Sequence, residues 1–132
     1  MKRWMFVTAV LLLLVGAAMA QNVIKYSLTS SSALAIGRAV KLGASDNTCT
    51  LAGAADGDSV IGFVGMTETG SGPTYYNLIV NAGRITAAIS GASDAVSVGS
   101  NLTVAAAGSL KVAGAGDRVI AKATQEVASP PG

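Results

Sequence analysis

Residues 59–66 read Ser-Val-Ile-Gly-Phe-Val-Gly-Met, and residues 75–80 read Tyr-Tyr-Asn-Leu-Ile-Val. Both runs are rich in β-branched, aliphatic and aromatic side chains, which favour extended backbone. Gly70-Ser71-Gly72-Pro73 lies between them, and glycine and proline in such a cluster favour a turn. The two runs and the intervening turn therefore predict two β-strands.

Further runs of this kind lie on either side, separated by clusters of Gly, Asp, Asn or Ser at intervals of about eight to twelve residues. No stretch beyond residue 20 has the 3.6-residue period of an amphipathic helix. The pattern predicts an all-β fold, either a small β-sandwich or a partly open β-barrel of short antiparallel strands. The additional strands are expected at residues 23–28, 38–42, 48–51, 84–89, 101–104, 109–112 and 118–124.

Two segments of the chain, residues 36–61 and 98–120, resemble each other. Each contains a glycine, a strand, a short loop, a second strand, a Gly-Asp pair and a Val-Ile strand, so that Gly57-Asp58 corresponds to Gly116-Asp117. Asn81-Ala82-Gly83 lies between the segments, and Asn and Gly tolerate the positive φ of a tight hairpin turn. The sequence therefore predicts two related three-strand units that flank a central hairpin over residues 75–89.

The first twenty residues have the features of a secretory signal peptide. Met1-Lys2-Arg3 is a short basic start, residues 4–18 are almost wholly apolar, and Ala18-Met19-Ala20 has the small-residue pattern of a cleavage site. We expect cleavage after Ala20, a single β domain over residues 21–128 and a short disordered tail over residues 129–132. The protein would then be exported to the periplasm, the cell surface or the extracellular space. The alternative is an uncleaved membrane anchor, although the apolar run is shorter than the roughly 20 residues that a spanning helix needs.

The charges of the chain argue against nucleic acid as a partner. The sequence has nine Lys and Arg and seven Asp and Glu residues, and Lys2 and Arg3 account for the whole positive excess. The other basic residues are scattered singly and form no stripe that could follow phosphates. Without its signal peptide the chain is neutral, so charge repulsion opposes the association of copies only weakly. This favours self-assembly.

Few residues could carry chemistry. The sequence has no histidine, which removes the commonest general base and metal ligand, and it has no Gly-x-Ser-x-Gly elbow. Asp56 and Asp58 flank Gly57, but the further donors of a calcium loop are missing, so we interpret both as turn residues. We therefore expect no enzyme activity, catalytic residue, cofactor, metal or small-molecule substrate. For Cys49, the only cysteine, a buried free thiol is favoured over a bridge between subunits.

The contact residues expected from the sequence are Tyr75, Tyr76, Val23, Ile24 and Tyr26. Neighbouring tyrosines on a strand point to opposite faces, so one of the pair at 75 and 76 should pack inward while the other stays on the surface. An exposed tyrosine can anchor a contact with a partner; the alternative is a partly buried ring with a hydrogen-bonded hydroxyl. The first strand could also fill a sheet edge in a neighbouring subunit.

Five stretches carry a family resemblance. They are Gly-Arg-Ala-Val-Lys-Leu (37–42), Asp-Gly-Asp-Ser-Val-Ile-Gly-Phe-Val-Gly (56–65), Leu-Ile-Val-Asn-Ala-Gly-Arg (78–84), Val-Gly-Ser-Asn-Leu-Thr-Val-Ala-Ala-Ala-Gly-Ser-Leu (98–110) and Gly-Asp-Arg-Val-Ile-Ala-Lys-Ala (116–123). In this order they resemble the small capsid cement or head-decoration proteins of tailed bacteriophages, over residues 37 to about 128. The resemblance implies a small β-protein without catalytic activity that binds the exterior of a capsid, often as an oligomer.

Two features depart from the pattern of that family. A signal peptide is not expected on a protein that assembles onto a capsid in the cytoplasm, and residues 127–132, Val-Ala-Ser-Pro-Pro-Gly, stand where relatives usually add a closing strand. We expect a structural protein that forms homo-oligomers, such as a trimer or a fibre, or decorates a larger assembly, such as a shell of major capsid protein at the virion surface. The alternative is an exported fibre or surface-layer subunit that assembles by strand addition.

Overall fold

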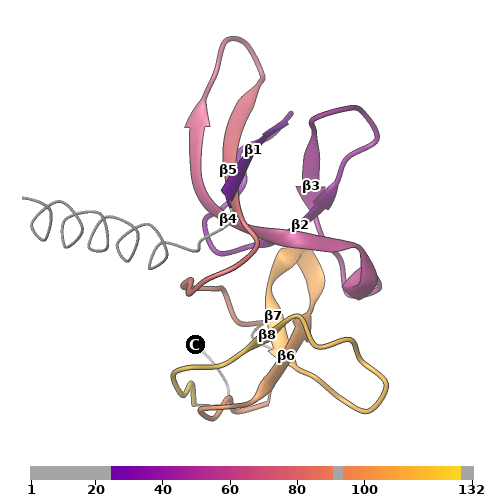
Figure 1. Cartoon of the computed structure of the whole chain (residues 1–132), viewed down its shortest axis with the longest axis vertical. Coiled ribbons are helices and arrows are strands. Elements are labelled where there is room, and N and C mark those ends of the chain that lie inside the picture. Colours follow the sequence, from indigo (N-terminus) through magenta and orange to yellow (C-terminus); the bar gives the residue numbers. More distant parts are fainter. Residues whose placement is uncertain (1–24, 91–93, 129–132) are drawn as a thin grey trace, which may run out of the picture.

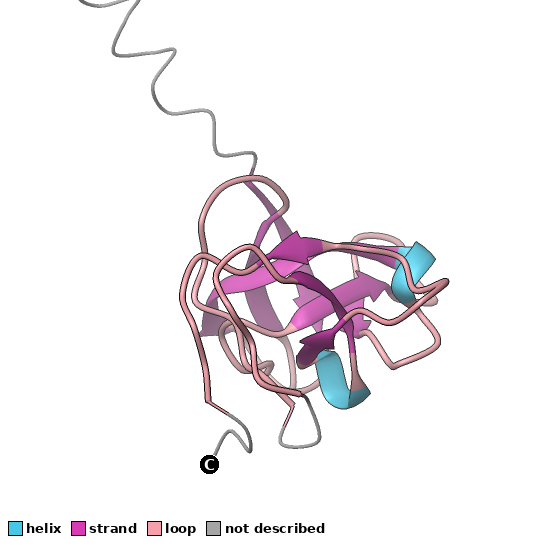
Figure 2. Ribbon diagram, turned by 90° about the horizontal axis from the view of Figure 1, so that it is seen from below, coloured by secondary structure: helices cyan, strands magenta, loops and turns pink. Residues whose placement is uncertain are grey.

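The chain forms two antiparallel sheets (Figure 1). The computed structural model describes residues 25–90 and 94–128. Within these ranges the helical elements are two single 3-10 turns, η1 (Gly57–Ser59) and η2 (Ala106–Gly108), which Figure 2 shows in cyan. The prediction of an all-β fold of short antiparallel strands is confirmed. The strands are β1 (Lys25–Ser30), β2 (Ala39–Leu42), β3 (Cys49–Leu51), β4 (Val60–Thr69), β5 (Tyr75–Val80), β6 (Asn101–Val104), β7 (Leu110–Val112) and β8 (Ala121–Lys122).

The five-stranded sheet has the order β1-β5-β4-β2-β3 and occupies the upper part of Figure 1. Its longest hairpin joins β4 to β5, so the two runs at residues 59–66 and 75–80 are neighbours in the sheet. Thr69 lies opposite Tyr75, and the Gly70 N–H donates a hydrogen bond to the Thr74 carbonyl at 2.8 Å. The glycine-rich turn therefore connects these two strands directly.

Register shifts accompany the curl of the five-stranded sheet. The pairing of β4 with β5 passes from Val64 to Met66 and leaves Gly65 between them, and the pairing of β2 with β4 shifts between Val40 and Lys41. Bulges of this kind bend a strand and increase its twist. The two edges of the curled sheet meet where the Thr29 N–H donates to the Asn47 carbonyl at 2.9 Å. A single bridge joins Thr29 of β1 to Thr48, the residue before β3, and no ladder forms between the two strands, so the sheet is not closed into a barrel.

Two hydrophobic cores hold the fold together. Leu28, Leu34, Val40, Cys49, Val64 and Ile79 pack together within the curled sheet. A second group lies between this sheet and the three-stranded sheet β7-β6-β8; its buried members are Ala39, Ala52, Phe63, Val96, Leu102, Val104 and Leu110. Both groups consist mainly of small and medium aliphatic side chains, as the low aromatic content requires.

The two predicted three-strand units are present. In each unit the first strand lies in the middle, since β2 pairs with β3 and β4, and β6 pairs with β7 and β8. The turn after the middle strand is also repeated: the Thr48 hydroxyl donates to the Ser45 carbonyl at 2.6 Å, and the Ser109 hydroxyl donates to the Ala106 carbonyl at 2.7 Å. At the start of each unit, Gly37 donates to Val64 at 2.7 Å and Gly99 donates to Ala123 at 2.8 Å.

The structure corrects one pairing between the units. Asp117 corresponds to Asp56, not to Asp58, because each of these two carboxylates accepts a hydrogen bond from the amide three residues earlier. The amides are those of Gly53 and Gly114. The first unit contains the extra turn η1 after this aspartate, which the second unit lacks within the described residues.

The predicted central hairpin is wrong. Residues 84–89 form no strand; Ile89 alone makes a bridge, to Leu110 of β7, and the chain bends at residues 82–83. The neighbours of β5 are β1 and β4, so no place beside β5 remains for a third strand. The expected strand at residues 118–124 shortens to the two residues of β8, because its ladder with β6 covers only Asn101 and Leu102.

Candidate interaction surface

The five predicted contact residues do not gather at one site. Val23 and Ile24 lie outside the described residues. Tyr76 is 49% exposed at the β4–β5 hairpin, where its ring lies beside Gly70, and Tyr75 next to it is partly buried. The expected difference between the two tyrosines is therefore present, although neither is in a core. Tyr76 remains available as a contact residue.

Tyr26 has an internal role. Its hydroxyl donates to the Ile61 carbonyl at 3.0 Å, and its ring packs against the core within the curled sheet. Burial, followed by the nearby Cys49 thiol, raises the pKa of Tyr26 above its ordinary value. This is the partly buried tyrosine with a bonded hydroxyl that the sequence left as the alternative, so Tyr26 is not a free contact residue.

The first strand is already used within its own chain. Residues 25–30 pair with residues 75–80 of β5 along the whole of β1. Assembly of subunits through this strand stays a prediction, and it would require β1 to leave β5 of its own chain.

Cys49 is buried at 1% exposure, as predicted. It belongs to a polar cluster that the sequence did not predict: the amide nitrogen of Asn77 donates to the Ser30 hydroxyl at 2.8 Å and lies 3.8 Å from the Cys49 sulfur. Burial raises the pKa of the Cys49 thiol, and the Asn77 contact opposes this in part. Because a raised pKa keeps the thiol protonated, the cluster is suited to packing and not to nucleophilic chemistry.

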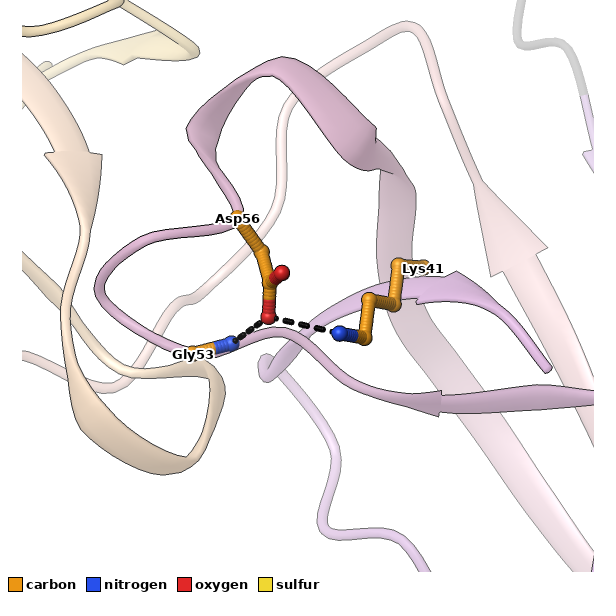
Figure 3. Close-up of polar contacts among 3 residues, drawn as sticks. All are labelled: Lys41, Gly53 and Asp56. Carbon is orange, nitrogen blue, oxygen red and sulfur yellow. Dashed lines mark hydrogen bonds and ion pairs between the residues drawn. The ribbon is translucent and has the colours of Figure 1, made fainter. Parts of the chain in front are cut away.

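The acidic side chains near η1 form a turn. Oδ2 of Asp56 accepts from the Gly53 amide at 2.7 Å and lies 2.8 Å from Nζ of Lys41 (Figure 3). The contact with Lys41, then the Gly53 amide, lowers the pKa of Asp56. Asp58 points elsewhere and lies 3.3 Å from Arg118. Among the described residues, no three His, Cys, Asp or Glu side chains come together in a group that could hold a metal.

Replacing Asp56 by asparagine is expected to lower the stability of the fold at neutral pH. The pKa of Asp56 is lowered by folding, so its carboxylate stabilises the folded state above its ordinary pKa, and this contribution is lost as the pH falls through the lowered value. The difference between the two proteins should be largest near pH 7 and shrink below about pH 4. Urea unfolding at several pH values measures it. Asp58→Asn is the matched control, because the side chain of Asp58 is 87% exposed; an equal loss in both variants would contradict the role of the turn.

Large aliphatic side chains lie exposed at several points on the surface. Two of them occupy corresponding positions of the repeated units: Ile36 is 62% exposed and Val98 is 69% exposed. Each directly precedes a glycine with positive φ, Gly37 at +80° and Gly99 at +86°. The sequence could have indicated this pair, because both residues stand at the first position of the repeat. Among the described residues, the other large exposed apolar side chains besides Tyr76 are Leu42, Met66 and Val119.

A groove of about 720 Å³ opens onto the core between the two sheets. Residues 81–87 and residues 120–125 both line it, together with the buried side chains of Phe63, Leu102 and Leu110. The sequence predicted strands over part of each lining stretch, at residues 84–89 and 118–124, and the structure has only β8 there. Within the described residues, no helix is long and apolar enough to cross a membrane.

Comparisons with protein-family models, with curated proteins and with solved structures gave no match to this chain.

Proposed function

We propose that this chain is a non-enzymatic structural subunit that assembles with copies of itself or coats a larger surface, as the phage capsid cement proteins that it resembles do. The observation that carries the proposal is the pair of exposed aliphatic side chains at Ile36 and Val98. A repeated unit that presents an exposed aliphatic side chain at the same position twice offers two similar contact points. Such points suit a regular surface or a symmetric assembly, in which one kind of contact recurs.

Several other features support a structural role. The strands are short and the carboxylates near η1 serve in a turn. The thiol of Cys49 is buried and its pKa is raised, which disfavours a nucleophile. We include export by residues 1–20 in the proposal, with the virion surface as the location if the capsid resemblance holds. The strand-addition alternative is less well supported, since β1 is paired within its own chain.

Changing Ile36 and Val98 together to serine is expected to weaken self-association or surface attachment by about tenfold or more, because exposed apolar anchors carry much of the energy of a contact. Both side chains are exposed, so the free energy of unfolding should change little. Sedimentation velocity over a range of concentrations measures association. The control is Leu42→Ser, which removes an equally exposed aliphatic side chain outside the pair.

Fractionation of the producing cells tests the proposed role directly. We expect the protein in the exported fraction or on large particles that sediment rapidly. Recovery only as a monomer that neither sediments with particles nor self-associates at high concentration would contradict the proposal.

A further inference from the structure

The groove between the two sheets is lined by apolar side chains of the core. It reaches the core at Phe63, Leu102 and Leu110, which are 9%, 5% and 1% exposed. These buried side chains form the apolar floor of the groove. An apolar group placed there would be in contact with side chains that are otherwise buried by the fold.

Within the described residues, one of the two backbone stretches that line the groove is unpaired, and the other is paired on one side. The backbone of residues 81–87 makes no hydrogen bond to any other residue in the part of the chain that the structure describes. Residues 121–122 belong to β8, which is an edge strand with β6 on one side only. The open side of an edge strand is a template for another strand. An occupant that is itself a polypeptide could thus pair with groups that a small apolar molecule would leave unpaired.

The charged side chains that line the groove are all basic. Arg84 and Lys122 both line it and both are exposed, and no ion pair is formed by either within the described residues. No carboxylate lines the groove. Charge complementarity therefore favours an occupant that carries acidic side chains at its edges and apolar side chains toward the core.

We propose that this groove binds an extended segment of a partner protein, in which acidic and aliphatic residues alternate, by strand addition. The alternation follows from the geometry of a strand, because successive side chains point to opposite faces. The aliphatic side chains would pack on Phe63 and Leu102, while the acidic ones would face Arg84 and Lys122. This inference does not depend on the proposed contact through Ile36 and Val98, since neither residue lines the groove.

The test uses the purified protein and a synthetic peptide, acetyl-Glu-Val-Glu-Val-Glu-Val-Glu-amide. We expect it to bind at least about tenfold more tightly than the matched peptide with Lys in place of Glu. The double variant Arg84→Gln and Lys122→Gln should lose this preference. Lys111→Gln should keep it, because Lys111 does not line the groove. Amide hydrogen exchange should slow on binding at residues 81–87 and 121–125 and nowhere else to the same extent.

Three results would overturn the proposal. The first is that the Glu and Lys peptides bind with equal affinity, or that neither peptide binds. The second is full binding of a Glu-Val peptide whose alternate backbone amides are methylated, because that peptide cannot complete a ladder of hydrogen bonds. The third is sodium dodecanoate, a small amphiphilic anion, binding more tightly than the peptide and displacing it, which would make the groove a site for small ligands.

Discussion

Replacing Gly37 by alanine is expected to lower the free energy of unfolding by about 2–5 kcal/mol, whereas Gly99→Ala should cost only about 1–2 kcal/mol. The two glycines occupy the same place in the repeated units and have nearly the same φ, +80° and +86°. An alanine at either position would therefore pay a similar free-energy cost for the left-handed backbone conformation. They differ in their surroundings: a Cβ at residue 37 would collide with the Thr86 carbonyl oxygen, while a Cβ at residue 99 would have nothing within 4 Å.

Urea unfolding of the two variants side by side measures the difference. The excess loss at Gly37 reports how firmly residues 86–87 pack against the start of the first unit, where the Ala88 N–H donates to the Gly37 carbonyl at 3.3 Å. Equal losses in the two variants would show that this segment does not pack there. Because the Ala88 N–H donates to the Gly37 carbonyl, Gly37→Ala should in addition speed amide exchange at residue 88.

Replacing Ile79 by alanine is expected to cost about 2–5 kcal/mol, the range for large-to-small changes in a well-packed core. Ile79 is fully buried in the core within the curled sheet, where it packs with Val64 and Cys49. The fold has few large side chains that could move into the cavity, since aromatic residues make up only 5% of the chain. We therefore expect little relief by repacking.

Chemical denaturation followed by circular dichroism gives the size of this loss. Ile79→Val should lose only about 0.5–1.5 kcal/mol. Ile36→Ala is the matched control, because it is the same substitution at an exposed position. Since Ile36 is 62% exposed, this variant should lose no more than about 0.5 kcal/mol of unfolding free energy. A comparable loss at residues 36 and 79 would contradict the placement of the core.

The sequence indicates the elements that local patterns control. Strands β4, β5 and β6 follow from β-branched and aliphatic runs bounded by turn residues, although β4 extends to Thr69, beyond the expected end at Met66. The two three-strand units follow from their repeated glycines and Val-Ile pairs. A strand also needs a neighbouring strand to pair with, and the composition of a segment does not show whether one is present. Residues 84–89 have the composition of a strand, but both sides of β5 are already taken by β1 and β4.

Contacts between distant residues decide the features that the sequence did not predict. Asn77 looks like a surface residue in an otherwise apolar strand, yet it is fully buried because Ser30, 47 residues away, accepts its hydrogen bond. Tyr26 looks like a contact residue until Ile61, 35 residues away, accepts from its hydroxyl. The groove arises in the same way, from two segments whose proximity no local pattern shows.

The pairing of β1 with β5 also sets the order in which the chain can fold. The side-chain amide of Asn77 in β5 donates a hydrogen bond to the carbonyl of Leu28 in β1, 49 residues away. Strands β2, β3 and β4 lie between these two residues in the sequence. Contacts of long sequence separation slow folding, because the entropy of closing the loop must be lost before the contact forms. The β4–β5 hairpin has a short turn and can form early, whereas β1 must wait for it. A chain that leaves the ribosome from its N-terminus therefore cannot complete the five-stranded sheet until residue 80 has emerged.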